Sequence, residues 1–376
     1  MSHRPIVPAI TEYLYRKSAL SGVPISGTFE LTPVCNMDCK MCYVRMSRQQ
    51  QEAVSPLATA EQWLELAGQC RDAGMLYLLV TGGEPFLHPQ IRQILTGLHK
   101  MGFVVSINSN GTLIDEETVA WLREVPPSRI NISIYGASND TYSALCGEPR
   151  GFDRTTKAIR LLKEAGIQVK LSISATPFNA KDLPAVVEYA KKNDLVVQVA
   201  TYMFPPLRRD PAMVGKNQRF TPQEAAWYTA YADYLIYGRE DFLRNAEKLT
   251  CPGYPEEDCA EVGEGIRCRA GKCSFWVTWE GKLLPCGMLA MPDAPNVFTQ
   301  PFMQAWEAVR TESARICLPA KCTGCPVREA CKACAAMVLT ETGGFDRVPE
   351  YRCQMAQALY TERKRLANQL LKENAE

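Results

Sequence analysis

The chain has 376 residues, of which 46% are hydrophobic and 22% charged, so it is long enough for two domains with a sizeable buried core. Its net charge of +1 argues against a nucleic-acid or membrane partner. No run of apolar residues approaches the length that a membrane-spanning helix needs. The N-terminal residues lack the apolar stretch of a signal peptide, so we expect a cytoplasmic protein without disulfides.

The 16 cysteines of such a chain indicate metal ligands. The chain has only three histidines, and none of them lies in a cysteine cluster. Any metal sites should therefore be built from thiolates alone, which favours iron–sulfur chemistry over catalytic zinc or haem.

Short apolar runs alternate with helical stretches between residues 26 and 205, a pattern typical of a parallel α/β sheet. In the first of these helices Thr59 and Gln62 have the spacing of a capping box, and Cys70 lies on the apolar face as a core residue. Gly166 is placed to end a later helix. The six apolar runs cover residues 26–33, 75–81, 103–109, 129–136, 169–176 and 196–204.

The unusual residues of this region all come just after a predicted strand. Cysteines follow the first strand, Gly82-Gly83-Glu84-Pro85 the second, Asn108 to Gly111 the third and Tyr135-Gly136 the fourth. Barrels build their sites at the carboxyl ends of their strands. The sequence therefore favours a partial (β/α)6 barrel over a doubly wound sheet.

The cysteines after the first strand are Cys35, Cys39 and Cys42, spaced C-x3-C-x2-C and followed by Tyr43. Three thiolates can hold three irons of a four-iron cluster and leave the fourth iron open for chemistry. Structural zinc prefers two matched C-x2-C pairs, which this loop does not have.

In this loop and the barrel region around it, the sequence resembles the radical SAM enzymes. The resemblance implies that Cys35, Cys39 and Cys42 bind a [4Fe-4S] cluster, whose open iron is chelated by the amino and carboxylate groups of S-adenosylmethionine. It further implies reductive cleavage of S-adenosylmethionine to a 5′-deoxyadenosyl radical, with electrons from a partner such as flavodoxin or ferredoxin.

The same resemblance implies further contacts to S-adenosylmethionine. Gly82 and Gly83 would let the backbone approach the ligand, and Glu84, followed by Pro85, would offer a carboxylate to its ammonium group. Asn110 and Ser133 resemble ribose contacts, and Ser174 a polar contact on the fifth strand. Taken alone, the GGEP motif is often only a turn, and the other three residues are equally well read as turn or inward-facing polar residues.

The rest of the chain divides into smaller parts. Residues 1–25 form an N-terminal segment, 206–260 a bridging region, 261–353 a cysteine-rich region and 354–376 a charged amphipathic helix. TWEGKLLPC in the cysteine-rich region predicts a hairpin that turns at Glu280-Gly281.

The cysteine-rich region resembles the SPASM extension of radical SAM peptide-modifying enzymes, in which eight cysteines hold two auxiliary [4Fe-4S] clusters. One gap departs from that pattern, because only two residues separate Cys331 from Cys334 where three are usual. The C-x2-C pairs over 322–334 leave a zinc ribbon as the alternative. Carried over by position, Cys268, Cys273, Cys286 and Cys334 would bind one cluster, and Cys322, Cys325, Cys331 and Cys353 the other.

Five cysteines remain, and buried free thiols are their default interpretation. Cys251 or Cys259 is the candidate for an alternative role, the donation of a hydrogen atom to a substrate radical, as in radical epimerases. The five are Cys70, Cys146, Cys251, Cys259 and Cys317.

Together these features predict a radical SAM enzyme that modifies a ribosomally made peptide, by thioether or carbon–carbon crosslinking. Peptide epimerisation is one alternative. A sulfatase-type maturase is another, although Gly287 and Met288 follow Cys286 where that family has an aspartate base. An electron carrier or a zinc-binding interaction module is the non-enzyme alternative. With no separate leader-binding domain expected, the peptide would be recognised by the barrel mouth, the cysteine-rich surface or a partner protein.

Overall fold

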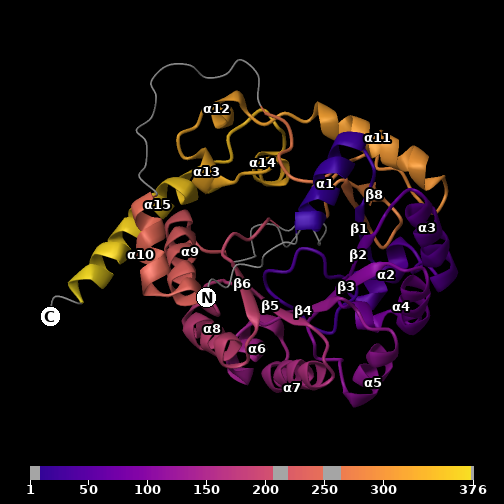
Figure 1. Ribbon diagram of the computed structural model, residues 1–376, viewed down its shortest axis with the longest axis horizontal. Helices are drawn as coiled ribbons and strands as arrows, with labels where there is room; N and C mark the ends of the chain where they lie inside the picture. The colour runs from indigo at the N-terminus through magenta and orange to yellow at the C-terminus, as the bar shows by residue number, and fades with distance from the viewer. Residues whose placement is uncertain (1–8, 206–218, 249–263, 374–376) are drawn as a thin grey trace.

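A single eight-stranded sheet organises the computed structural model, which describes residues 9–205, 219–248 and 264–373. Its strand order is β6-β5-β4-β3-β2-β1-β7-β8, and the sheet curves around the middle of the molecule (Figure 1). The strands are β1 (Ser26–Glu30), β2 (Tyr77–Thr81), β3 (Val104–Ser109), β4 (Arg129–Ser133), β5 (Val169–Ser174), β6 (Val196–Ala200), β7 (Ser274–Val277) and β8 (Leu283–Leu284).

The strand pairing confirms the partial barrel. From β1 to β6 each strand pairs in parallel with the next one along the chain, and β1 and β6 are not neighbours. A doubly wound sheet reverses its strand order at a switch point, which does not happen here. The carboxyl ends of all six strands therefore lie at one edge of the open barrel.

Helices cover the outer side of the sheet, and their ends follow the predicted signals. Thr59 and Gln62 form the expected capping box, Cys70 is completely buried, and Gly166 has a φ of +74° after its helix. The helices are α1 (Ala9–Ser21), α2 (Arg48–Val54), α3 (Ala60–Asp72), η1 (Pro85–Leu87), α4 (Ile91–Lys100), α5 (Glu116–Glu124), α6 (Asn139–Cys146), α7 (Gly151–Glu164), η2 (Ala180–Asp182), α8 (Leu183–Lys192), α9 (Pro222–Tyr237), α10 (Arg239–Lys248), α11 (Phe302–Arg315), α12 (Ala320–Thr323), α13 (Arg328–Cys331), α14 (Ala335–Thr342) and α15 (Glu350–Lys372).

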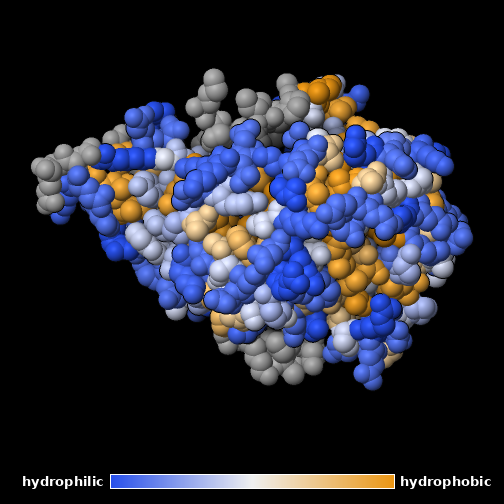
Figure 2. All heavy atoms as spheres, turned by 90° about the horizontal axis from the view of Figure 1, so that it is seen from below, coloured by the Kyte–Doolittle hydropathy of each residue, from blue (hydrophilic) through white to orange (hydrophobic). Residues whose placement is uncertain are grey.

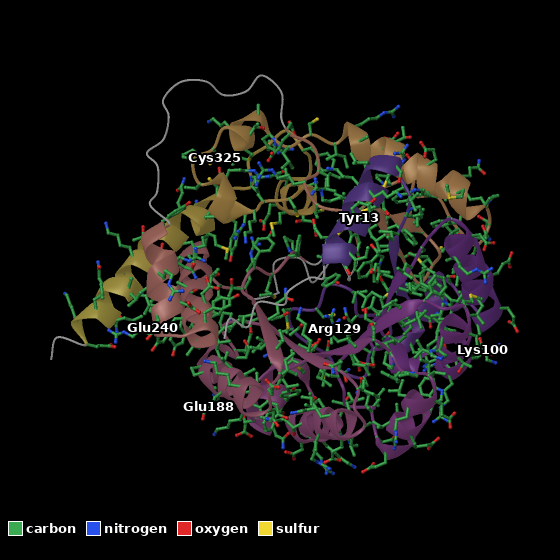
Figure 3. All side chains as sticks on the ribbon, in the orientation of Figure 1. Tyr13, Lys100, Arg129, Glu188, Glu240 and Cys325 are labelled. Carbon is green, nitrogen blue, oxygen red and sulfur yellow. The ribbon has the colours of Figure 1, made fainter. Side chains whose placement is uncertain are left out.

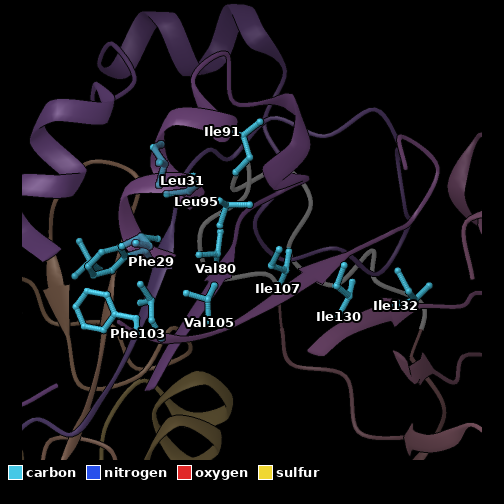
Figure 4. Packing of buried hydrophobic residues seen from close by; sticks show 14 of the residues in the cluster. Phe29, Leu31, Val80, Ile91, Leu95, Phe103, Val105, Ile107, Ile130 and Ile132 are labelled. Atoms are coloured by element: carbon cyan, nitrogen blue, oxygen red, sulfur yellow. The ribbon is translucent and has the colours of Figure 1, made fainter. Parts of the chain in front are cut away.

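The two faces of each barrel strand differ in chemistry. Side chains that point outward, such as Val80, Ile107 and Ile130, are buried against the helices and form the hydrophobic core (Figure 4). The alternate residues point inward and are polar at many positions, for example Asn131 and Ser172, which are only partly buried. Closed barrels fill their interior with branched apolar side chains. The inner wall of this barrel is instead suited to contact a polar ligand.

The cysteine-rich region joins both edges of the open barrel. β7 pairs in parallel with β1, and the β7–β8 hairpin turns at Gly281, with a φ of +85°, as predicted. At the other edge Tyr202, just after β6, donates a hydrogen bond of 2.6 Å to Glu341 on α14. Figure 1 shows the region between them spanning the gap that the sheet leaves. The ring is thus completed by segments far apart in sequence.

The C-terminal helix α15 fastens this region to the barrel. It packs along α9, where Arg363 forms a 2.6 Å ion pair with Asp233. Its first residue is Glu350, four positions earlier than the predicted start, so the helix includes Cys353. In its first turn Arg352 donates hydrogen bonds to the carbonyl of Cys331. The helix thereby holds one cysteine against the segment that carries several others.

The outer surface over the barrel helices is mostly hydrophilic, with hydrophobic patches between the polar residues (Figure 2). This agrees with amphipathic helices that bury one face against the sheet. None of the helices among the described residues is both long and apolar enough to cross a membrane.

Replacing Glu341 with Ala should lower the free energy of unfolding by about 3 kcal/mol, because Arg219 would then keep a half-buried guanidinium without its carboxylate partner. Glu341 is only 9% exposed and accepts hydrogen bonds from both Arg219 and Tyr202. Thermal unfolding of anaerobically prepared protein measures the change. The control is Glu312→Ala, which breaks the exposed pair with Arg315 and should cost less than about 1 kcal/mol. Equal losses in the two variants would contradict the expectation.

Candidate active site

The loop that carries Cys35, Cys39 and Cys42 lies at the carboxyl end of β1. Its backbone is held by the end of α6, because the amides of Asp38 and Lys40 donate hydrogen bonds of 2.8 Å and 3.0 Å to the carbonyls of Cys146 and Leu145. Cys39 is buried, while Cys35 and Cys42 are half-buried. All three are free thiols, as is every other described cysteine.

The environment of these thiols suits a bound cation. Burial raises the pKa of Cys35 to about 12, and the nearby Glu84 carboxylate adds to the shift. A hydrogen bond with the Cys146 thiol, together with burial, raises the pKa of Cys39. A metal centre would supply the positive charge that such buried thiolates need.

Backbone amides point at the sulfur atoms of several cysteines. The amide of Met37 lies 3.4 Å from Cys35 Sγ, that of Arg45 3.3 Å from Cys42 Sγ, and that of Met288 3.5 Å from Cys286 Sγ. Hydrogen bonds of this kind favour the thiolate form and tune iron–sulfur clusters. The all-thiol donor set and these amides therefore fit an iron–sulfur cluster at the loop.

The two glycines after β2 allow this segment to approach the cysteine loop. A Cβ atom on Gly82 would lie 2.5 Å from the Thr32 carbonyl oxygen, and one on Gly83 2.5 Å from that of Val34. The close approach permits hydrogen bonds from Gly83 N to Thr32 O at 2.6 Å and from Glu84 N to Val34 O at 2.9 Å. Glycine is required at both positions because the two backbone segments pack against each other here, next to the loop that bears the cysteines.

The Glu84 carboxylate is completely buried and connects the ends of β2 and β3. It accepts hydrogen bonds from Ser109 Oγ at 2.9 Å and from the Asn110 amide at 2.8 Å. A third hydrogen bond, of 3.3 Å, comes from the amide of Phe86 in the turn that begins at the buried Pro85. Burial raises the pKa of Glu84 to about 7. Glu84 therefore holds Asn110 in place beside the cysteine loop.

Asn110 contacts the first cysteine directly. Its Nδ2 lies 3.7 Å from Cys35 Sγ and donates a 2.9 Å hydrogen bond to Asn36 Oδ1. Asn36 in turn donates to Thr112 Oγ1 at 2.8 Å. Asn36 and Thr112 were not among the residues predicted from the sequence, although both are polar and each lies next to a predicted motif.

Ser133 and Ser174 lie at the carboxyl ends of β4 and β5, on the inner face and at the same edge as the cysteine loop. Cys146, which the sequence left as a core thiol, is indeed completely buried, and it also contacts Cys39. Cys251 and Cys259 lie outside the described residues. Cys317 is exposed.

The cysteines of the C-terminal region gather in two places. Burial raises the pKa of Cys322 to about 11, and the neighbouring thiols of Cys331, Cys325 and Cys353 add to the effect, so these four side chains lie close together. Figure 3 shows Cys325 in this segment, across the ring from Arg129 on the inner side of the sheet.

The second gathering lies nearer the sheet. Burial is the main cause that raises the pKa of Cys273 and of Cys334, and the nearby Cys268 thiol raises both further. Cys286 and Cys268 line the same cavity as the inner wall of the barrel. Within the described residues, no three His, Cys, Asp or Glu side chains lie close enough to hold a single metal ion. One zinc ion would need its sulfurs at about 2.3 Å from the metal, whereas a four-iron cluster takes its ligands on different irons.

These features define a candidate active site at the carboxyl edge of a partial barrel, where a three-cysteine loop meets the ends of β2 and β3. Residues 29–190 match the family model of the Radical SAM superfamily. The chain therefore carries a radical SAM domain and is an enzyme. Such a domain implies a [4Fe-4S] cluster and S-adenosylmethionine as cofactors, which the donor set described above fits.

The similarity to known proteins extends beyond this domain. The chain is 24% identical over 347 residues to an AdoMet-dependent heme synthase of Methanosarcina barkeri, covering 87% of this chain and 95% of that protein. It is 26% identical over 311 residues to the antilisterial bacteriocin subtilosin biosynthesis protein AlbA of Bacillus subtilis, covering 80% of this chain and 65% of that protein. Streptococcus suis SuiB bound to its precursor peptide SuiA has the same fold, with a TM-score of 0.65, 18% identity and coverage of 93% and 82%.

Proposed function

We propose that this enzyme modifies a ribosomally synthesised peptide by radical chemistry, with oxidative crosslinking as the outcome. The observation that carries the proposal is the placement of the cysteines. A three-cysteine loop lies at the carboxyl edge of the barrel, and two further groups of cysteines lie across the ring, one of them lining the barrel cavity. A substrate inside the barrel would therefore lie between a site that starts a radical and thiols suited to electron-accepting clusters.

Cys35, Cys39 and Cys42 would hold the [4Fe-4S] cluster that binds S-adenosylmethionine. Cys268, Cys273, Cys286 and Cys334 would hold one auxiliary cluster, and Cys322, Cys325, Cys331 and Cys353 the other. When bound, these groups supply a 5′-deoxyadenosyl radical and an electron acceptor. The proximity of Cys334 to Cys268 supports the first set in spite of the short gap after Cys331.

The residues of the chain itself position the reactants. Glu84 and Asn110 hold the cysteine loop at a fixed distance from the end of β3. Polar side chains on the inner wall, including the partly buried Ser133 and Ser174, would orient the cofactor and the peptide. Holding both in one geometry turns hydrogen abstraction into a step between neighbours.

Crosslinking fits this arrangement better than epimerisation does. A crosslink removes two hydrogens from the peptide and so requires an electron acceptor, whereas epimerisation returns a hydrogen and requires none. The relatives named above include a bacteriocin biosynthesis protein and a fold neighbour bound to a precursor peptide, which supports a peptide substrate. The sulfatase-type alternative remains weakened by Gly287 and Met288, which offer no carboxylate base after Cys286.

A tetrapyrrole is the second candidate substrate, because the Methanosarcina barkeri heme synthase aligns along nearly its whole length with this chain. The two candidates differ in the product that each predicts. Coexpression with a short peptide encoded next to the gene, followed by mass spectrometry, should show loss of two hydrogens from the peptide. An unchanged mass together with conversion of an added tetrapyrrole would contradict the peptide function and support the second candidate.

A further inference from the structure

A large cavity opens at the amino ends of the barrel strands, on the edge opposite the cysteine loop. Its volume is about 1220 Å³. The first residues of β1, β2, β3 and β4 form one side of it, α1 forms another, and the turn before β7 closes the third. The cavity reaches Thr28 and Trp276 on the inner wall. It is therefore a second entrance to the barrel interior.

The charges around this entrance are strongly unequal. Its cationic side chains come from three separate segments, whereas Glu12 is the one carboxylate among the described residues that line it. Glu12 lies 3.4 Å from Arg269, and Arg267 pairs with Glu264. The cations that line the cavity are Arg16, Arg129, Arg267, Arg269 and Lys272.

Three of these cations have no carboxylate within ion-pair distance among residues 9–205, 219–248 and 264–373. Arg16 comes from α1, Arg129 begins β4, and Lys272 lies in the turn before β7. Figure 3 shows Arg129 toward the middle of the ring on the inner side of the sheet. Charges left unpaired on three sides of one cavity attract and orient an anion.

Aromatic packing holds part of this entrance rigid. Tyr15 of α1 stacks on Tyr77 of β2 with ring centroids 5.5 Å apart, and the Arg269 guanidinium lies 3.4 Å from the centre of the Tyr15 ring. A guanidinium fixed in this way loses little entropy when it binds a carboxylate through its forked donors.

We propose that this entrance binds carboxylate groups of the substrate, so that an acidic peptide segment is anchored at the amino ends of the strands while the residue to be modified extends toward the cysteine loop. The proposal rests on the proposed function, because it names the substrate class for the same barrel. Since Cys268 and Cys286 line this cavity too, an anchored peptide would pass beside them.

Fluorescence anisotropy with a fluorescein-labelled oligoglutamate peptide, and with the oligoglutamine peptide of equal length, tests the proposal on anaerobically reconstituted full-length protein. The oligoglutamate should bind, and raising the salt should weaken it. Arg129→Gln and Arg16→Gln should each weaken its binding roughly three- to tenfold, in the range of a single exposed or partly buried ion pair.

Arg123→Gln is the matched control, because Arg123 is exposed on α5 and does not line the cavity, so its removal should leave binding unchanged. Equal binding of oligoglutamine, or binding of oligoglutamate that neither Arg129→Gln nor Arg16→Gln weakens, would overturn the proposal.

Two further measurements separate this inference from the proposed function. Coproporphyrin III carries its carboxylates on a tetrapyrrole. Its displacement of the oligoglutamate peptide, weakened by Arg129→Gln and Arg16→Gln, would support carboxylate binding, and the mass of the coexpressed peptide then decides whether the substrate is a peptide. If the oligoglutamate binds through these arginines but the enzyme forms no 5′-deoxyadenosine from S-adenosylmethionine under reducing conditions, the proposed function fails and the carboxylate site stands.

Discussion

Replacing Cys35, Cys39 and Cys42 together with Ala should reduce formation of 5′-deoxyadenosine from S-adenosylmethionine by more than about 100-fold. Changes to residues that only support a metal ligand already cost up to about that factor, and these substitutions remove the proposed ligands themselves. Each of the three thiols lies in the loop after β1, where amides from Met37 and Arg45 point at two of the sulfurs. Chromatographic detection of 5′-deoxyadenosine in anaerobic reactions with dithionite measures the loss.

The control for this prediction is Cys317→Ala. Cys317 is exposed and is not one of the proposed cluster ligands, so its replacement should leave 5′-deoxyadenosine formation unchanged. Persistent formation of 5′-deoxyadenosine in the triple variant would contradict the assignment of the loop as the cluster site.

Replacing Cys322 and Cys325 with Ala should stop product formation while keeping the cleavage of S-adenosylmethionine within about tenfold of the original rate. Cys322 lies on α12 and Cys325 just after it, and both thiols belong to the group with Cys331 on α13 and Cys353 on α15. Loss of that group removes an electron acceptor from the proposed reaction but no ligand from the site that binds S-adenosylmethionine.

Iron analysis gives this second prediction an independent readout. The reconstituted enzyme should hold about 12 irons per chain, and the Cys322/Cys325 variant about 8, because each cluster contains four. Zinc in place of iron would contradict the three-cluster assignment and favour the zinc ribbon over 322–334. A variant that still forms the modified peptide at the original rate would show that this group of cysteines has no part in the reaction.

Local patterns in the sequence predicted the barrel well. Each apolar run became a strand, and the capping box at Thr59 and the turn at Gly281 formed as expected. These signals are short-range, because strand alternation, helix caps and turns depend on residues a few positions apart. The order of motifs along the chain also predicted that the cysteine loop, Glu84 and Asn110 meet at one edge, since parallel strands share that edge.

Other features depend on contacts that no local pattern contains. The contact of Glu84 with S-adenosylmethionine stays a prediction, and the structure adds that this buried carboxylate accepts hydrogen bonds from Ser109 and Asn110 beside the cysteine loop. The sequence predicted a buried free thiol at Cys146, and the structure adds that its place at the end of α6 brings it into contact with Cys39. Both outcomes follow from how loops after different strands pack on one another.

The sequence by itself determined the radical SAM barrel and the position of the three-cysteine loop, because an apolar strand followed at once by three cysteines leaves little choice of position. Only the tertiary structure decided how the rest of the chain closes that barrel. β7 pairs with β1, and Glu341 bonds to Tyr202 beyond β6, so the cysteine-rich region completes the ring. The cationic entrance likewise combines α1, β4 and the turn before β7. Such contacts join residues more than 100 positions apart, and they form only when the sheet and the packed helices bring them together.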